Sequence, residues 1–373
     1  MLRSFATLAL AFGLAATSTG CDSSDTPAAV DEVVVLGTNV DASFLDDGQF
    51  DILATPLSAQ GAALLTDVNE VRVTVASSSP GARLTPGTFT ISAGVQGTNA
   101  PSGNPLAVAI SLDQSSSMGG TDPNRLRVDG ARAFVDVLDS LGTGYEVGVF
   151  AFGATTFQDT SFASTDLLFD YTSIADSARA AIGRVGAFTG TPTYPSLIET
   201  LEYSERVRPT GQYERAVVLL SDGSPNGTSR RQEACDLATA MDSPVYAIGL
   251  GPASDLSPSP SPGAVEEMRS IAQCTGGSYA GISAAADGSV DLTSIRRIYE
   301  SIAVGTARGS LTVGVTLSGE AFDALQPGDT ITGELTLGTD GGSTSSSFAF
   351  TVPARAGAAA AWTPIFPDGA AQW

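Results

Sequence analysis

The sequence predicts an α/β protein: a doubly wound, mostly parallel sheet that is flanked by, or inserted into, an all-β sandwich built from the N- and C-terminal segments. In residues 105–304, short apolar runs alternate with segments of helical period. That alternation is typical of a parallel sheet covered by helices on both faces. Residues 32–104 and 305–353 instead alternate with period two, as antiparallel strands with one solvated face do. A chain of 373 residues is long enough for two domains or three small ones.

The N-terminal flank contains four segments of strand character, separated by turns rich in Gly, Pro, Asp and Ser. They are residues 33–35, 50–53, 71–75 and 88–91. Between the first two segments, Asp46, Asp47 and Gly48 predict a hairpin turn, with a calcium-binding loop as the alternative.

The central segment contains both kinds of element. Apolar runs that predict buried strands lie at residues 105–112, 145–152, 216–220 and 245–250. Helical spacing of apolar residues predicts helices at residues 125–141, 174–185, 196–206, 229–241, 265–273 and 292–303.

The C-terminal flank returns to strand character at residues 311–315, 331–335 and 348–352. Three strands alone make a marginal unit. We therefore expect them to join the N-terminal strands in one sandwich, with the α/β domain of residues 105–304 inserted between two of its strands. Separate small domains are the alternative. Residues 354–373 are rich in Ala, Gly and Pro and receive no assignment.

Composition excludes several classes of function. The formal net charge is −22, which repels phosphate backbones and argues against a nucleic-acid partner. The chain has neither histidine nor lysine, so no Ser-His-Asp triad, Cys-His pair, His-Glu-x-x-His zinc site or lysine phosphate loop can form. A hydrolase based on carboxylate pairs is not excluded by composition, but no spacing supports one. We therefore predict no enzyme activity.

The first twenty residues have the pattern of a targeting segment. Arg3 precedes a short apolar core at residues 5–16, and small residues then lead to Cys21. The apolar core is too short to span a bilayer as a helix. The pattern resembles the bacterial lipobox, which implies a lipidated Cys21, a tether at residues 21–31, and an exported protein anchored by lipid to the bacterial cell envelope. An ordinary secretory signal is the alternative.

The two remaining cysteines, Cys235 and Cys274, favour one disulfide in an exported protein. Cys235 lies on the helix predicted at residues 229–241, and Cys274 ends the helix predicted at residues 265–273. Both helices flank the strand predicted at residues 245–250, so they can be neighbours. Two buried free thiols are the alternative.

Five residues with oxygen-bearing side chains form the candidate functional site. They are Asp113, Ser115, Ser117, Thr191 and Asp222. The first three follow the strand predicted at residues 105–112, and Asp222 comes just after the strand predicted at residues 216–220. The carboxyl ends of such strands are where α/β sheets place their ligand crevice. Oxygen ligands without His or Cys nearby suit Mg²⁺, Mn²⁺ or Ca²⁺ rather than zinc or copper.

These residues also match the motifs of a known family. Residues 113–117 fill the pattern Asp-x-Ser-x-Ser, Thr191 lies in a Gly-Thr loop, and Asp222 precedes a glycine after a later strand. In this, the segment 106–302 resembles the von Willebrand factor type A domain and its metal-ion-dependent adhesion site. Ser116 stands where glycine is usual in the family, but that position is not a ligand.

The resemblance implies a site that binds a cation and, through it, a partner. It implies that Ser115 and Ser117 coordinate the cation directly and that the other three residues do so directly or through water. One coordination position stays open to a carboxylate from the partner, and Mg²⁺ is the expected cation, with Ca²⁺ or Mn²⁺ as alternatives. In a serine-rich chain, a degenerate or purely structural site is the alternative.

Together these patterns predict a binding module on the cell envelope that recognises an acidic residue of a protein ligand through a divalent cation. The alternative is an envelope-assembly or enzyme-accessory subunit whose metal site is mainly structural. The Ser/Pro-rich loop at residues 252–263 follows a predicted strand, so we expect it to rim the site and help to select the ligand. A simple spacer is the alternative for that loop.

Overall fold

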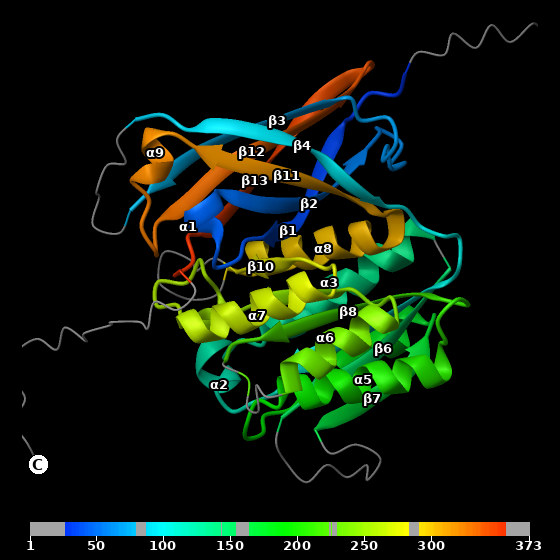
Figure 1. Cartoon of the computed structure of the whole chain (residues 1–373). Helices are drawn as coiled ribbons and strands as arrows, with labels where there is room; N and C mark the ends of the chain where they lie inside the picture. The colour runs from blue at the N-terminus through cyan, green and yellow to red at the C-terminus, as the bar shows by residue number, and fades with distance from the viewer. Residues whose placement is uncertain are drawn as a thin grey trace, which may run out of the picture.

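The computed structural model describes residues 27–79, 87–142, 144–153, 164–223, 225, 230–282 and 291–355. Two units are stacked on each other: a β-sandwich and an α/β unit with helices on both faces of its sheet (Figure 1). This arrangement confirms the predicted fold class. The predicted leader, the tether up to residue 26 and most of the C-terminal segment lie outside the described residues.

The sandwich is built from both flanks of the chain. One layer has the strand order β4-β11-β2-β1 and the other β13-β12-β3. The first layer consists of β1 (Glu32–Asn39), β2 (Gln49–Leu57), β4 (Thr90–Asn99) and β11 (Ser310–Ser318). The second consists of β3 (Glu70–Ser78), β12 (Thr330–Thr339) and β13 (Gly342–Thr351). Between the layers, Phe44, Phe50 and Phe350 pack edge-on or tilted with ring centroids 4.9–6.1 Å apart, and apolar residues from both flanks surround them.

The α/β unit is inserted between two strands that pair with each other. β4 and β11 are antiparallel neighbours, and Asn99 at the end of β4 pairs with Ser310 at the start of β11. The chain therefore leaves the sandwich and returns to it at adjacent points, and the insertion does not interrupt the pairing of these strands. The predicted domain boundaries themselves stay predictions.

The sheet of the α/β unit continues the first layer of the sandwich in the order β10-β9-β8-β5-β6-β7. Its strands are β5 (Leu106–Asp113), β6 (Tyr145–Phe152), β7 (Thr165–Thr172), β8 (Glu214–Ser221), β9 (Val245–Gly249) and β10 (Tyr279–Gly281). The pairs within it are parallel except that of β6 with β7. All eight residues of β5 are buried, as its unbroken apolar run predicts. The strand β7 was not predicted, because this edge strand is half-buried and mixes charged with apolar residues.

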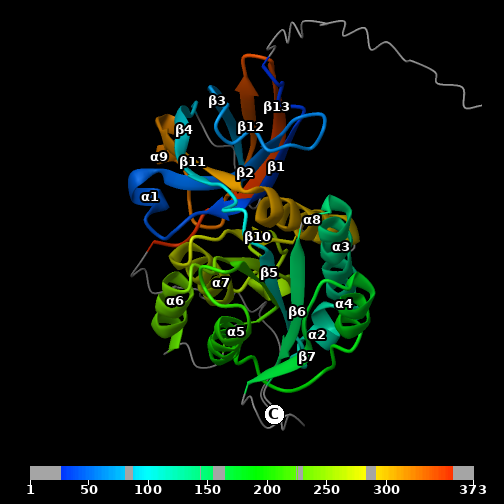
Figure 2. The same cartoon turned by 90° about the vertical axis from the view of Figure 1, so that its right-hand side faces the viewer.

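In the described part of the chain, helices cover both faces of this sheet (Figure 2). One face carries α3 (Leu126–Leu141), α4 (Ala175–Ile182) and α8 (Leu292–Arg308), and the other α5 (Thr193–Val207), α6 (Arg231–Ala240) and α7 (Pro262–Cys274). The carboxylate of Asp291 caps the start of α8 by accepting from the backbone N–H groups of Thr293 and Ser294. The predicted helices are present, but α5 begins at Thr193 rather than Ser196, and α8 continues to Arg308.

Short helical turns also occur elsewhere in the described residues. They include α2 (Met118–Thr121), the 3₁₀ turn η2 (Gly251–Ala253) and α9 (Glu320–Asp323). The predicted hairpin turn at Asp46 and Asp47 is instead a single helical turn, α1 (Phe44–Asp47), which ends at Gly48 with φ 71°. A Cβ at Gly48 would lie 2.0 Å from the carbonyl oxygen of Leu317, so only glycine fits there.

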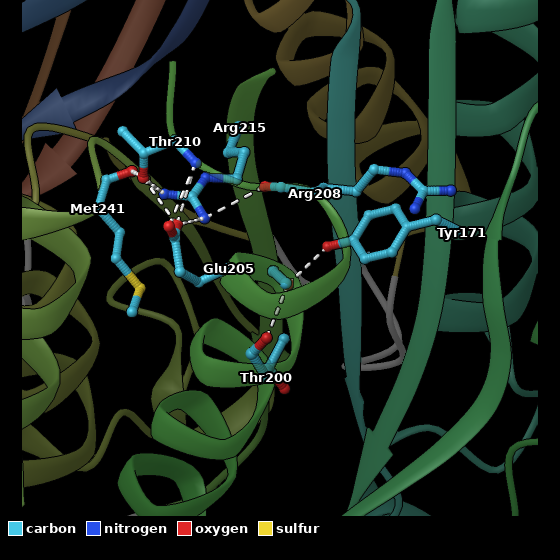
Figure 3. A network of polar contacts seen from close by, with 8 residues as sticks. Tyr171, Thr200, Glu205, Arg208, Thr210, Arg215 and Met241 are labelled. Carbon is cyan, nitrogen blue, oxygen red and sulfur yellow. Dashed lines mark hydrogen bonds and ion pairs between the residues drawn. The ribbon is translucent and has the colours of Figure 1, made fainter. Parts of the chain in front are cut away.

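A polar network fixes the amino end of β8 (Figure 3). The buried guanidinium of Arg215 donates to the Glu205 carboxylate, to the Thr210 hydroxyl and to the Met241 carbonyl. Next to it, the Tyr171 and Ser204 hydroxyls lie 2.6 Å apart. A buried cation is tolerated only when such partners replace its water. The network therefore holds the strand whose other end carries Asp222.

The predicted disulfide is confirmed: Cys235 on α6 and Cys274 at the end of α7 are bonded, with Cα atoms 5.7 Å apart.

We expect the double variant Cys235→Ser, Cys274→Ser to lose about 3–4 kcal/mol of unfolding free energy, because a cross-link over 39 residues restricts the unfolded chain. Urea denaturation of variant and parent measures this loss. A parent kept under reducing conditions is the matched control, and equal midpoints for the oxidised parent and the variant would contradict the expectation.

Candidate metal centre

The candidate site lies at the carboxyl ends of the two central strands of the parallel sheet. β5 and β8 are parallel neighbours, and Leu112 pairs with Leu220. The next residues, Asp113 and Ser221, therefore emerge side by side at this edge of the sheet. The helical turn α2, which directly follows the loop after β5, lies at the same edge (Figure 1).

Hydrogen bonds join four of the five predicted site residues into one chain of contacts. The Asp113 carboxylate accepts from the Ser115 backbone N–H at 2.7 Å, which folds the loop back on itself. The Ser115 and Ser117 Oγ atoms are 2.9 Å apart. The Ser117 hydroxyl in turn donates to Asp222 Oδ1 at 2.8 Å, across 105 residues of sequence. Ser116 and Ser117 are exposed, so the site opens to solvent at this loop.

The fifth residue, Thr191, is brought to the site by its own loop. It is 8% exposed, and a Cβ added to Gly223 would lie 3.8 Å from its Oγ1 atom, which places the hydroxyl beside Asp222. The structure therefore gathers all five predicted residues at one edge of the sheet. Their assignment as metal ligands stays a prediction.

Two carboxylates are buried together in this site. Asp113 is fully buried and Asp222 is 1% exposed. Burial raises the pKa of Asp113 to about 6, hydrogen bonds from Ser115 and Ser221 oppose the rise, and the Asp222 charge adds to it. The Asp222 Oδ2 atom is buried and has no hydrogen-bond partner among the described residues. Among the described residues no arginine forms an ion pair with either carboxylate, so the site has an uncompensated negative charge.

The arrangement fits a hard divalent cation. Oxygens at adjacent corners of an octahedron with bonds of about 2.0–2.1 Å lie roughly 2.9 Å apart. The distances from Ser115 Oγ to Ser117 Oγ and from Ser117 Oγ to Asp222 Oδ1 are 2.9 and 2.8 Å. No group of three or more His, Cys, Asp or Glu residues that could hold a metal occurs in the described part of the chain. A cation here would therefore depend on hydroxyl oxygens as well as on the two carboxylates.

Sequence reasoning missed two residues that position the site. The Ser221 hydroxyl donates to Asp113 Oδ2 at 2.6 Å and holds the carboxylate in place. The backbone carbonyl of Gln114 accepts a hydrogen bond from the Phe188 N–H at 2.6 Å. Its side-chain carbonyl accepts another from the Gly186 N–H at 3.0 Å. These two bonds tie the segment before Thr191 to the loop after β5. The role of Ser221 could have been predicted by aligning β5 with β8 as parallel neighbours, which sets Ser221 beside Asp113. No sequence pattern indicates the role of Gln114.

The comparison with protein families decides the identity of the α/β unit. The family model described as "von Willebrand factor type A domain" matches residues 107–294. The chain belongs to the von Willebrand factor type A family. VWA domains often mediate binding between proteins. The matched segment contains all five predicted site residues.

Solved structures with a similar arrangement come from several kinds of organism. A von Willebrand factor type A protein from Catenulispora acidiphila has 12% identity and a TM-score of 0.41, over 89% of this chain and 75% of that one. Proximal thread matrix protein 1 from the mussel byssus, with a "zinc occupied MIDAS motif", has 17% identity and a TM-score of 0.39, over 62% of this chain and 50% of that one. An aerotolerance-related membrane protein from Bacteroides fragilis has 21% identity and a TM-score of 0.36, over 54% of this chain and 98% of that one.

Likenesses this distant say nothing about the ligand of the present chain, which spans only half of the mussel protein. Among curated protein sequences, none matches the chain.

The Ser/Pro-rich loop after β9 lies between the site and the sandwich. At its start, Leu250 donates its N–H to the Ser221 carbonyl at 3.0 Å, and a Cβ on Gly251 would meet the Thr121 side chain of α2. Further on, Asp255 accepts from the Thr351 N–H of β13 at 2.9 Å. The loop is also shorter than predicted, because α7 already begins at Pro262. Leu250 and Gly251, just before the predicted loop, border the site, and Asp255 within the loop contacts the sandwich. That residues 252–263 rim the site and help to select the ligand stays a prediction.

The uncompensated charge leads to a test on stability. We expect Asp222→Asn to raise the unfolding free energy in EDTA by about 1–2 kcal/mol, because it removes a buried charge without a compensating partner. In Mg²⁺ the order should reverse, since the neutral amide binds a divalent cation more weakly than the charged carboxylate does. Thermal denaturation in both buffers measures the two effects. Asp31→Asn, at an exposed carboxylate, controls for the general loss of negative charge, and a variant less stable than the parent in EDTA would contradict the expectation.

Proposed function

We propose that the chain is a cell-envelope binding module whose VWA domain recognises an acidic residue of a protein ligand through a divalent cation, with Mg²⁺ as the expected ion. One observation carries this proposal. Two buried carboxylates and two serine hydroxyls converge at a sheet edge that is open to solvent, and one carboxylate oxygen there has no hydrogen-bond partner in the part of the chain that the structure describes. A cation supplies the missing partner, and membership of a family that often binds proteins supports the rest.

Each residue has a part in this proposal. Ser115, Ser117 and Asp222 present their oxygens to the cation, and Ser221 orients the Asp113 carboxylate behind them. Thr191 approaches from the side of Gly223. A bound Mg²⁺ supplies a coordination position that a partner carboxylate can occupy in place of water. The exposed position of Ser116 and Ser117 leaves room for a partner to approach.

A cation also solves an electrostatic problem of recognition. The chain has a formal net charge of −22, so direct contact with an acidic ligand is opposed by repulsion. A divalent ion at the contact point reverses the local sign while the rest of the surface remains acidic. Binding should therefore be lost entirely when the ion is removed, rather than only weakened.

Attachment to the envelope is the second part of the proposal. Among the described residues, no helix is both apolar and long enough to cross a membrane. We assign the attachment to lipidation of Cys21, which lies outside the described residues and follows a leader with a short apolar core. The lipid would hold the sandwich near the membrane through the N-terminal tether.

The metal assignment is tested by Asp113→Ala. In the parent, Mg²⁺ at about 100 times its Kd should add about 2.7 kcal/mol to the unfolding free energy. We expect the variant to fold and to lose this gain, because the missing carboxylate is the one that Ser115 and Ser221 position. Thermal denaturation with MgCl₂ and with EDTA measures it. Ser116→Ala changes an exposed hydroxyl of the same loop that is no predicted ligand, and it should keep the full gain. Equal gains in Asp113→Ala and parent would show that the assignment is wrong.

The same pair of variants separates the proposed function from its alternative. Ligand captured from an envelope extract by the immobilised parent and by Ser116→Ala should be released by EDTA, and Asp113→Ala should capture none. If the metal is mainly structural, as in an assembly or accessory subunit, EDTA will lower the stability of the parent but leave a captured partner bound.

The anchoring proposal is tested by Cys21→Ser. The lipoprotein modification adds several acyl chains, and more than one chain is needed for stable attachment. We expect the variant either to leave the membrane fraction or to accumulate as an uncleaved precursor. Fractionation and mass spectrometry of the N-terminus measure both outcomes. Unchanged fractionation together with an N-terminus at another residue would favour an ordinary secretory signal.

A further inference from the structure

A cleft lies where the sandwich separates from the VWA unit. β1 and β10 share a single residue pair, Thr38 with Tyr279. β1 then bends at an irregularity between Val35 and Gly37, as strands do at a bulge, and continues into the sandwich. The opening between the two units has a volume of about 380 Å³. Small-molecule sites commonly have about 300–1,000 Å³ and often lie between domains.

The walls of the cleft combine apolar surface with hydroxyl groups. Leu36 of β1, Phe348 of β13 and Ile298 of α8 supply the apolar part. Thr38 and Ser301 also line the cleft and are only 6% and 9% exposed. Both hydroxyls are polar groups on the cleft wall that can bond to water or to a ligand.

The charge of the cleft is positive although the whole chain is strongly acidic. Among the described residues, the charged ones that line it are Asp255 and Arg297. Asp255 is neutralised, because its carboxylate accepts from Arg269 at 2.6 Å and from the Thr351 N–H at 2.9 Å. Arg297 has no ion pair with any described residue. Its neighbour Arg296 does not line the cleft, and its Nε atom lies 3.7 Å from Glu300 Oε1.

We propose that this cleft binds a small amphiphilic carboxylate. The guanidinium of Arg297 at its edge matches the two oxygens of a carboxylate, and Ser301, one helical turn further along α8, lies on the same helix face. The apolar walls accept the body of the ligand. One unpaired arginine suits a single negative charge better than a phosphate dianion, which a chain of net charge −22 repels more strongly. The site is separate from the metal centre and needs no cation.

The test uses phenylacetate and hexanoate as probes, with the neutral phenylacetamide as the matched amide. Binding is measured by ligand-observed NMR and titration calorimetry on the whole chain in EDTA, so that the metal centre cannot contribute. We expect both acids to bind the parent and phenylacetamide to bind about tenfold more weakly, because it lacks the charge-assisted contact to Arg297. Arg297→Gln should weaken the acids by a similar factor.

Arg296→Gln is the matched control, because it removes the same charge from the neighbouring position of the same exposed helix surface without lining the cleft. It should leave the affinity unchanged. Ser301→Leu, which fills the cleft from inside, should abolish binding while Mg²⁺ still stabilises the variant. Equal losses of affinity in Arg297→Gln and Arg296→Gln would show that the acids respond to general surface charge, which would contradict the proposal. Absence of binding by both acids, or binding that Ser301→Leu does not affect, would overturn the proposal.

Discussion

The parallel pairing of β5 with β8 is the constraint on which the candidate site depends. Both strands are buried in the middle of the sheet, so their register cannot shift without exposing apolar side chains or burying polar ones. That register sets Asp113 beside Ser221, and the hydrogen bond between them fixes the carboxylate. At the other end of β8, the Arg215 network holds the strand in place. The site is therefore precise because a rigid sheet positions it, although its residues lie on loops.

The buried carboxylates of the site carry a cost in stability that a bound cation would offset. Two carboxylates are buried near each other, and the serine hydroxyls that contact them cannot neutralise their charge. The chain could have placed apolar residues at the ends of these strands, as it does along their length. Retaining the charge makes physical sense if a cation is part of the working state. Natural proteins place such unfavourable local arrangements at functional sites, where the rest of the fold compensates for them.

The sequence predicted those parts of the structure whose pattern is local. Unbroken apolar runs identified β5 and β8, and residue types at strand ends identified Asp113 and Asp222. It could not predict contacts that depend on the packing of distant segments. Gln114 positions the Thr191 loop only because residues 186–188 lie beside it in the fold. The edge strand β7 lacked a clear pattern, since an edge strand needs no apolar alternation when one side meets solvent.

The two units are joined by more than their covalent connections. α8 leads directly into β11, and β11 pairs with the strand that precedes the insertion. On the other side, the loop after β9 bonds to Ser221 at its start and to the end of β13 through Asp255. The ion pair of Asp255 with Arg269 is almost fully buried, so breaking it would leave an uncompensated charge. A short segment thus contacts both the candidate metal centre and the sandwich.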